Sequence, residues 1–268
     1  MARVVRPPAV AGVFYPAGAA ALRAELRRQL DAVPAAGDAV PPKAIIVPHA
    51  GLHYSGAVAA CAYARAAPLR GVVRTVVLLG PAHYGDGGIA LSGADAFASP
   101  LGALPVDADA TARVLALPCT HVRDGVHAPE HCLEVQLPFV QVVLGDVAIL
   151  PALAGRGAAG AAEAVLDALW DGDATLLVVS SDLSHYLDDA TARARDRRTA
   201  AAVEALDADA IPDAGACGRE AVQALLRAAR RRGLTAHTVA LGTSADTGGD
   251  RDRVVGYGAF VLDARSER

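Results

Sequence analysis

Apolar residues recur along the chain with two spacings, one typical of helices and one typical of short buried strands. Leu22, Leu26 and Leu30 lie four residues apart, which places them on one face of a helix. Short runs rich in Val, Ile and Leu, bounded by Gly, Pro or Ser, predict strands. The expected helices cover residues 19–33, 56–66, 107–116, 158–170, 191–206 and 219–232, and the expected strands cover 44–47, 72–79, 147–150, 175–179 and 254–262.

The alternation of these strands with helices predicts an α/β fold, with a central, mostly parallel or mixed β-sheet sandwiched between helices. A polar, glycine-rich stretch that ends near Pro105 predicts short antiparallel strands and turns. Asp107 or Asp109 can cap the helix that follows. No internal repeat or low-complexity linker divides the chain, so we expect one domain over residues 1–268.

Three of the predicted strands share a second feature, because each ends directly in a turn that carries a histidine. In open α/β sheets the ligand crevice lies outside the carboxyl ends of the strands. Side chains from separate strands can therefore converge there. The histidines in these turns are His49, His83 and His185.

His49 and His83 are candidate metal ligands, because imidazole binds borderline metals and a metal site needs ligands held on rigid elements. The position alone equally allows hydrogen-bonded histidines in the wall of a crevice. His185 follows Asp182 by three residues. If their turn opens a helix, both side chains share a face and can hydrogen-bond, as an acid–base pair requires. Asp182 could instead cap that helix.

Cys217 precedes the helix expected from residue 219. A helix N-terminus lowers the pKa of a thiol and favours the thiolate, which binds metals. A free cysteine also commonly fills space in a core. The other cysteines lack such a setting, and none forms a C-x-x-C pair, which argues against a structural zinc knuckle.

The segment 127–134 is dense in side chains that can bind a metal or a substrate. Its order of His and Glu does not match the H-E-x-x-H pattern of zinc proteases. We therefore expect Glu130 and His131 to face the substrate or to support the ligands. Residues 155–160 fit G-x-G-x-x-G, but four residues separate them from Leu150, the end of the preceding strand. That gap argues against the tight turn of a dinucleotide site.

Charge and composition narrow the function further. The net charge of −4 gives no basic footprint for nucleic acid or an anionic membrane. No apolar run reaches the length of a membrane span, and residues 1–10 lack the apolar core of a signal peptide. We therefore expect a cytoplasmic protein. The basic run near residue 230 is explained by cations that favour the end of a helix.

Eight short blocks, in order along nearly the whole chain, resemble the Memo family, also known in bacteria as AmmeMemoRadiSam system protein B. No single block would be specific, but together they are. The blocks are VAGVFYP (10–16), PHAGLHYSG (48–56), GPAHYG (80–85), SPLG (99–102), EHCLEVQLPF (130–139), SSDLSHY (180–186), ACG (216–218) and VVGYGAF (254–260).

The resemblance implies the fold of LigB-type class III extradiol dioxygenases, in which two histidines and a glutamate hold Fe(II). Here it implies His49, His83 and Cys217 as metal ligands. His185 matches the acid–base histidine of those enzymes, with Asp182 beside it. We also expect Tyr54, in the second block, at the pocket. Leu52 stands where the family usually has Tyr, and Cys132 stands where Ser is common.

A thiolate in place of the carboxylate softens the site, so Cu or Zn are alternatives to the expected Fe(II). The leading hypothesis is an Fe(II)-dependent, dioxygenase-like oxidoreductase acting on a small organic substrate. One alternative is a non-catalytic module that binds metal or a phosphopeptide, and another is a partner of a radical-SAM enzyme. A metal-free hydrolase using Cys217 and His185 is the most distant alternative.

Overall fold

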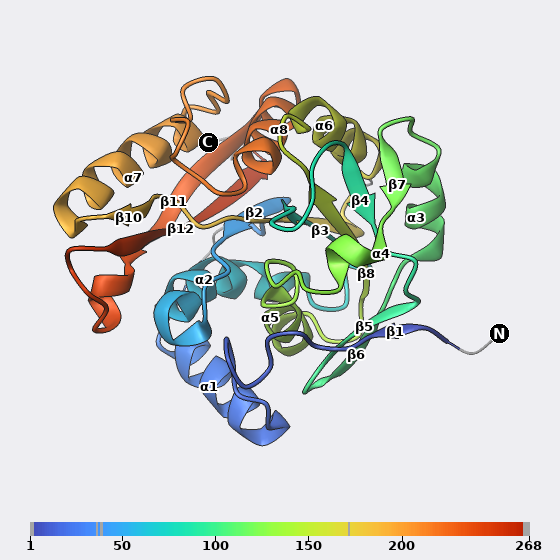
Figure 1. Ribbon diagram of the computed structural model, residues 1–268, viewed down its shortest axis with the longest axis horizontal. Coiled ribbons are helices and arrows are strands. Elements are labelled where there is room, and N and C mark those ends of the chain that lie inside the picture. Colours follow the sequence, from blue (N-terminus) through green and yellow to red (C-terminus); the bar gives the residue numbers. More distant parts are fainter. Residues whose placement is uncertain (1–2, 36, 38–39, 171, 265–268) are drawn as a thin grey trace.

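A nine-stranded mixed sheet runs through the centre of the protein, with helices on both of its faces (Figure 1). The computed structural model describes residues 3–35, 37, 40–170 and 172–264. The helices are α1 (Ala19–Asp31), α2 (Leu52–Ala66), α3 (Ala108–Leu115), α4 (Asp124–His127), α5 (Gln136–Val143), α6 (Ala159–Ala168), α7 (Asp189–Glu204) and α8 (Arg219–Arg231), with 3-10 turns at Ala67–Leu69 and Ser244–Thr247. The strands are β1 (Val5–Arg6), β2 (Ala44–Val47), β3 (Thr75–Pro81), β4 (Ile89–Leu91), β5 (Ala96–Ser99), β6 (Gly102–Pro105), β7 (Thr120–Val122), β8 (Ala148–Ala154), β9 (Thr175–Ser180), β10 (His185–Leu187), β11 (Leu234–Thr243) and β12 (Val254–Ala264).

The large sheet has the strand order β10-β12-β2-β9-β3-β8-β4-β7, and β11 pairs with β12. Its centre, β2-β9-β3-β8, is parallel, whereas β12 and β4 pair with this centre in the antiparallel sense. Strands β1, β5 and β6 form a separate small sheet beside it. The predicted α/β fold with a mixed sheet between helices is therefore confirmed.

Each central strand is buried on both faces, because helices pack on either side. Along β2, Ile45 and Val47 join one core cluster with α1, α2 and α5, while Ala44 and Ile46 join another with α3, α6, α7 and α8. This two-sided burial explains why the central strands read as continuous apolar runs.

The order of the central strands opens a crevice at their carboxyl ends. The chain passes from β2 to β3 through α2 on one face, and from β8 to β9 through α6 on the other. Strand β9 is the neighbour of β2, and from its end the chain continues through β10 to α7, on the same face as α6, so neighbouring strand ends send the chain to opposite faces. Such a switch point is where α/β sheets bind ligands.

Most predicted elements are present, with shifted ends. The helix expected at 56–66 begins earlier, at Leu52, and the strand expected at 147–150 continues to Ala154 because its last residues pair with β3. Asp107 caps α3 by accepting from the Ala110 amide. Helix α5 and strand β11 were not predicted: α5 has no polar stripe and contains Pro138, and β11 carries no strict alternation of apolar residues.

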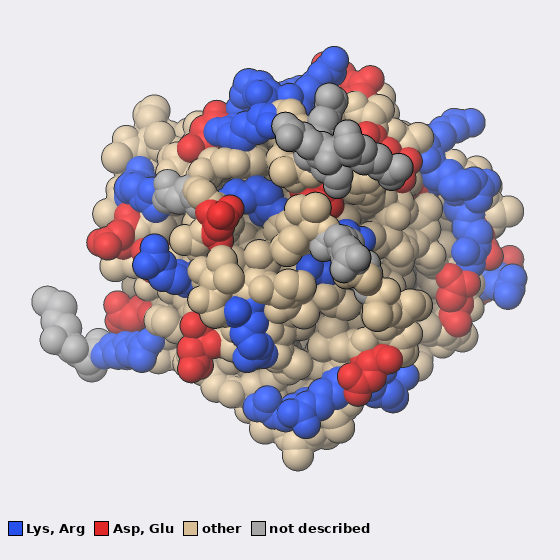
Figure 2. All heavy atoms as spheres, turned by 180° about the vertical axis from the view of Figure 1, so that it is seen from behind, with Lys and Arg blue, Asp and Glu red and all other residues tan. Residues whose placement is uncertain are grey.

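Charged side chains on the outer surface lie in separate groups in which both signs occur. The face in Figure 2 shows Lys and Arg at several places with Asp and Glu nearby. Arg231, near the end of α8, pairs with Glu163 and Asp167 of α6. Within the described ranges, no helix has both the length and the apolar run that crossing a bilayer requires.

Gly256 of β12 gives a test of the packing between the sheet and α7. A Cβ atom there would lie 1.8 Å from the Asp196 carboxylate, which is buried and accepts the Ser184 amide. We expect Gly256→Ala to lower the free energy of unfolding by about 1–3 kcal/mol through overpacking. Gly160→Ala in α6, where nothing lies within 4 Å, is the control and should not lower it, because alanine is favoured over glycine in a helix by about 0.5–1 kcal/mol. Equal effects in urea denaturation would contradict this packing.

Candidate metal centre

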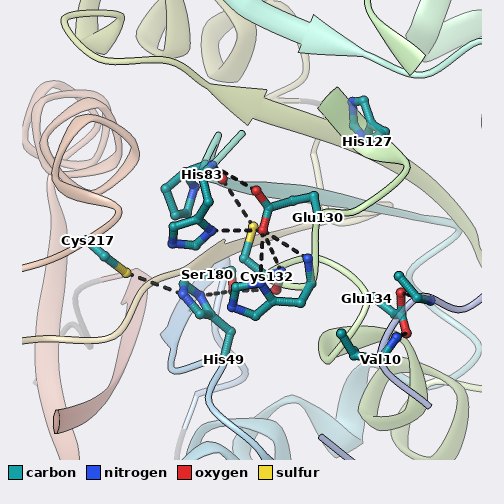
Figure 3. A network of polar contacts seen from close by, with 12 residues as sticks. Val10, His49, His83, His127, Glu130, Cys132, Glu134, Ser180 and Cys217 are labelled. Atoms are coloured by element: carbon teal, nitrogen blue, oxygen red, sulfur yellow. Dashed lines mark hydrogen bonds and ion pairs between the residues drawn. The ribbon is translucent and has the colours of Figure 1, made fainter. Parts of the chain in front are cut away.

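The crevice brings together two of the three strand-end histidines and one cysteine. His49 follows β2, His83 follows β3, and Cys217 lies just before α8. Their ligand atoms all lie within 4.8 Å of one another, and Cys217 Sγ is 3.3 Å from His49 Nε2. Figure 3 shows the thiol of Cys217 pointing toward the His49 ring. These residues form a group that can hold a metal ion.

The His49 ring is held in one tautomer by a chain of hydrogen bonds behind it. Ser180 Oγ donates its only proton to the Cys132 carbonyl and accepts from Gln136 Nε2. The contact of 2.9 Å between His49 Nδ1 and Ser180 Oγ therefore requires the ring to donate. His49 Nε2 keeps its lone pair and faces the crevice. Burial lowers the pKa of His49 to about 4, so the ring is neutral at pH 7.

His83 is oriented in the same way by a carboxylate. Its Nδ1 lies 2.8 Å from Glu130 Oε1, and its backbone amide donates to Glu130 Oε2. Although burial opposes it, hydrogen bonds from His83 and from the Cys132 amide hold the pKa of Glu130 at about 2. An ionised Glu130 only accepts, so His83 Nδ1 carries the proton and Nε2 is free to bind.

The setting of Cys217 differs from the predicted one. The residue precedes Gly218, the N-cap of α8, and the expectation that the helix end lowers its pKa is wrong. Burial and the negative charge of Asp182 raise the pKa of the Cys217 thiol well above its usual range. The Asp182 amide donates to Sγ over 3.2 Å, but it does not offset these effects. In the metal-free protein the thiol is protonated.

Asp182 serves His49 rather than His185. The expected helical turn does not form, because Ser181 and Leu183 donate backbone hydrogen bonds to Val47 and Gly256 and stay extended. Asp182 Oδ1 accepts the His49 amide, and Oδ2 lies 3.9 Å from His49 Nε2. The predicted hydrogen bond between Asp182 and His185 is therefore wrong.

His185 opens β10, and its ring contacts the Leu183 carbonyl and Tyr186. Among the described residues, no hydrogen bond or ring contact joins it to His49, His83 or Cys217. The position of His185 thus gives no support to convergence of all three strand-end histidines.

A different histidine occupies the place beside the ligands. The His131 ring stacks on His83 with centroids 4.9 Å apart and meets His49 edge-on at 5.4 Å. Glu130, His83 and His131 form a second group whose ligand atoms lie close together. The carboxylate of Glu130 already accepts from the His83 ring and from three backbone amides, so this group is best explained as support for His83. Tyr54, in the first turn of α2, is half-exposed and its ring contacts His53.

One side of the ligand group opens to a cavity of about 760 Å³, which His83 and Cys217 line together with Tyr84, Arg156 and Asp213. His49 is buried behind them. A metal ion held here would therefore have protein on one side and space for a small molecule on the other. Catalytic metal sites keep such an open position, whereas structural sites are closed.

The glycine-rich motif at 155–160 has another explanation than phosphate binding. Because β8 reaches Ala154, Gly155 follows the strand directly, and the predicted gap does not exist. A Cβ on Gly155 would lie 2.5 Å from the Gly87 backbone, so the glycine allows two loops to pack together. The Gly157 amide donates to the Glu220 carboxylate. A dinucleotide phosphate would have to displace that carboxylate.

Sequence reasoning missed the side chains that set the tautomer of His49, although it predicted Glu130 as support for the ligands. These side chains are Ser180 and Gln136, and no local pattern around either predicts that role. Gln136 Oε1 accepts from Tyr63, which fixes the direction in which its amide donates to Ser180. The contacts of Ser180 with His49, of Gln136 with Ser180 and of Tyr63 with Gln136 all join residues far apart in sequence. Gln136 stands out in the sequence only as part of the block EHCLEVQLPF.

Known proteins with similar sequences match almost the whole chain. The model of the family described as Memo-like protein matches residues 6–261. A MEMO1 family protein from Methanococcoides burtonii is 33% identical over 271 residues, covering 96% of this chain and all of that protein. Another, from Aquifex aeolicus, is 34% identical over 273 residues, covering 96% and 99%.

A solved structure with the same fold is that of an uncharacterized protein from Escherichia coli K12. It has a TM-score of 0.57 and covers 81% of this chain and 98% of its own, at 11% sequence identity. At that identity the likeness concerns the fold alone.

The protonated thiol leads to a pH dependence of metal binding. Because Cys217 must lose its proton while His49 is already neutral, we expect the apparent affinity for Zn(II) to rise about tenfold per pH unit between about pH 7 and 8.5. Titration calorimetry in buffers of different ionisation enthalpy counts the released proton. In Cys217→Ser the dependence should be lost. A wild-type affinity independent of pH over this range would contradict the assignment of Cys217 as a ligand.

Proposed function

The chain belongs to the Memo-like protein family, and we propose that it is a metal-dependent oxidoreductase in which His49, His83 and Cys217 hold Fe(II) beside a pocket for a small organic substrate. The observation that carries this proposal is the closeness of three donor atoms, all within 4.8 Å of one another, at the edge of a cavity.

The separation of Cys217 and His49 and the protonation of the two imidazoles fit a shared transition-metal ion. Sulfur and nitrogen ligands of one tetrahedral ion lie about 3.5 Å apart, given their usual bond lengths. The distance of 3.3 Å between Cys217 Sγ and His49 Nε2 is close to this value. Both imidazoles offer an unprotonated Nε2, as metal binding requires. In this arrangement, Ser180 and Glu130 would keep the rings aimed at the ion.

Two histidines and a third anionic ligand resemble the donor set of non-haem Fe(II) oxygenases, although those use a carboxylate. Bound Fe(II) would supply the redox chemistry and the open positions for O₂ and substrate. The thiolate of Cys217 also suits Cu and Zn, so the metal found in the purified protein decides between redox chemistry and Lewis-acid chemistry.

Within the pocket, the protein's own residues would exclude water and move protons. Burial places His49 out of reach of solvent. Burial also lowers the pKa of His131, which leaves this ring neutral and able to accept a proton. Because His131 contacts both ligand rings and His185 does not, we assign proton handling beside the metal to His131. Asp182, which accepts the His49 amide, then has a positioning role on the loop after β9, and His185, at the start of β10, has no role beside the metal.

Oxygen consumption tests the proposed activity. Protein loaded with Fe(II) under anaerobic conditions should take up O₂ when a catechol-type substrate is added. His49→Ala should lose the uptake at least about 100-fold, because it removes a ligand. His237→Ala is the matched control, since His237 lies on β11 and is largely exposed. Uptake no greater than that of His49→Ala would exclude this substrate class.

The same experiment separates the second candidate function, a non-catalytic binding module. The thiolate ligand favours this candidate, because the carboxylate typical of Fe(II) oxygenases is absent from the group of three. Tight metal binding without O₂ uptake for any catechol-type substrate would support it.

A further inference from the structure

The segment that supports His83 has little regular structure of its own. Residues 128–135, between α4 and α5, form bends and turns, yet they carry both Glu130 and His131. A carboxylate that fixes a ligand must itself be held to within a fraction of an ångström. Helix or strand hydrogen bonds do not provide this here, so other contacts must.

A buried arginine near the N-terminus supplies those contacts. Arg6, at the end of β1, is only 6% exposed. Its Nε donates to the His127 carbonyl over 3.1 Å, and Nη2 donates to the carbonyls of Ala128 and Glu130 over 3.3 and 2.6 Å. Its Nη1 pairs with Glu134 Oε2 at 2.5 Å. One guanidinium thus joins the end of α4 to three residues of the segment, Ala128, Glu130 and Glu134.

Glu134 completes a closed network on the other side of this arginine. Its carboxylate accepts the amides of Ala9 and Val10 over 2.7 and 2.9 Å, and it also accepts the Tyr15 hydroxyl. Burial and the charge of Glu134 raise the pKa of Tyr15 well above its usual range, so the hydroxyl remains a donor. Figure 3 shows Val10 beside Glu134, on the side of this segment away from Cys217.

The network also reaches His131 through the N-terminal loop. Phe14, next to Tyr15, packs its ring on His131 with centroids 4.9 Å apart, and its carbonyl accepts the Leu52 amide at the start of α2. The N-terminal segment therefore contacts both Glu130 and His131, the two residues whose side chains lie against His83.

We propose that the Arg6–Glu134 pair is a positioning device for the metal centre: it fixes the backbone at Glu130 and thereby holds the Glu130 carboxylate that selects the binding tautomer of His83. The proposal rests on the proposed function as far as the metal is concerned. The fork of donors on Arg6 matters as much as its charge, because four of its bonds go to neutral carbonyls, three of them between residues 127 and 130. Lysine keeps the charge but cannot reach these points together.

The test uses Arg6→Lys and, as a second variant, Glu134→Gln. In the metal-free wild type, nitrogen NMR of the histidine rings should report His83 as the Nδ1-protonated tautomer. Both variants should show a mixture of tautomers and bind Zn(II) about 10–100-fold more weakly, the usual effect of disturbing a group behind a ligand. In a Glu130→Gln background, Arg6→Lys should cause no further loss, because the two changes act through one contact.

Asp107→Ala is the control for a purely structural effect. Asp107 caps α3 and binds Thr75, at the start of β3 and so at the end of the sheet remote from the crevice. Its loss should lower stability by about 1 kcal/mol. The control should leave the His83 tautomer unchanged and Zn(II) affinity within about twofold.

Two results would overturn the proposal. One is an unchanged His83 tautomer in both folded variants. The other is a loss of Zn(II) affinity from Arg6→Lys that is equally large in the Glu130→Gln background. Failure of the proposed function is distinguishable, because it would appear as no metal binding by the wild type, while the tautomer measurement needs no metal.

Discussion

The candidate centre depends on one constraint: each of two imidazoles must present Nε2 to the same point, so each must have its proton held on Nδ1. Ser180 imposes this on His49, and Glu130 imposes it on His83. The hydroxyl of Ser180 donates its own proton to the Cys132 carbonyl, and the carboxylate of Glu130 remains ionised. Both groups can therefore only accept a hydrogen bond from the imidazole. Without them, either ring could turn its protonated nitrogen toward the crevice and the donor group would be lost.

The sheet explains why these four side chains can meet. Strand β9 lies between β2 and β3 in a parallel register, so the ends of all three strands are level. Ser180 closes β9 directly behind His49. Glu130 comes from outside the sheet, on a segment of turns, and therefore needs its own support. The buried pair of Arg6 and Glu134 is placed to give it.

The thiol sets the chemical character of the centre. Burial and Asp182 disfavour the thiolate of Cys217, so the metal-free pocket is not a reactive cysteine site of the usual kind. A bound cation would instead favour the thiolate of Cys217, because its positive charge compensates the negative charges of the thiolate and of the Asp182 carboxylate. The same burial keeps His49 neutral. The metal-free pocket thus has two ligands prepared for binding, His49 and His83, and a third, Cys217, that binds only with loss of a proton.

Site residues that a local sequence pattern marks were predictable from the sequence. Residues whose role depends on contacts with distant parts of the chain were not. His49 and His83 follow apolar strands, and parallel strands bring such turns together. Cys217 needed the resemblance to the Memo family, since a place just before a helix equally suits a cysteine that fills space in a core. The pairing of Asp182 with His185 was wrong because backbone bonds to β2 and β12 keep that turn extended. Arg6 and Gln136 contact partners more than 40 residues away, which no spacing rule detects.

The most direct test of a metal held by His49, His83 and Cys217 is anomalous diffraction from crystals of protein purified without added metal and then supplied with Fe(II) or Zn(II). We expect one anomalous peak, within bonding distance of His49 Nε2, His83 Nε2 and Cys217 Sγ. An empty crevice under these conditions, or a peak between His83, Glu130 and His131 instead, would contradict it.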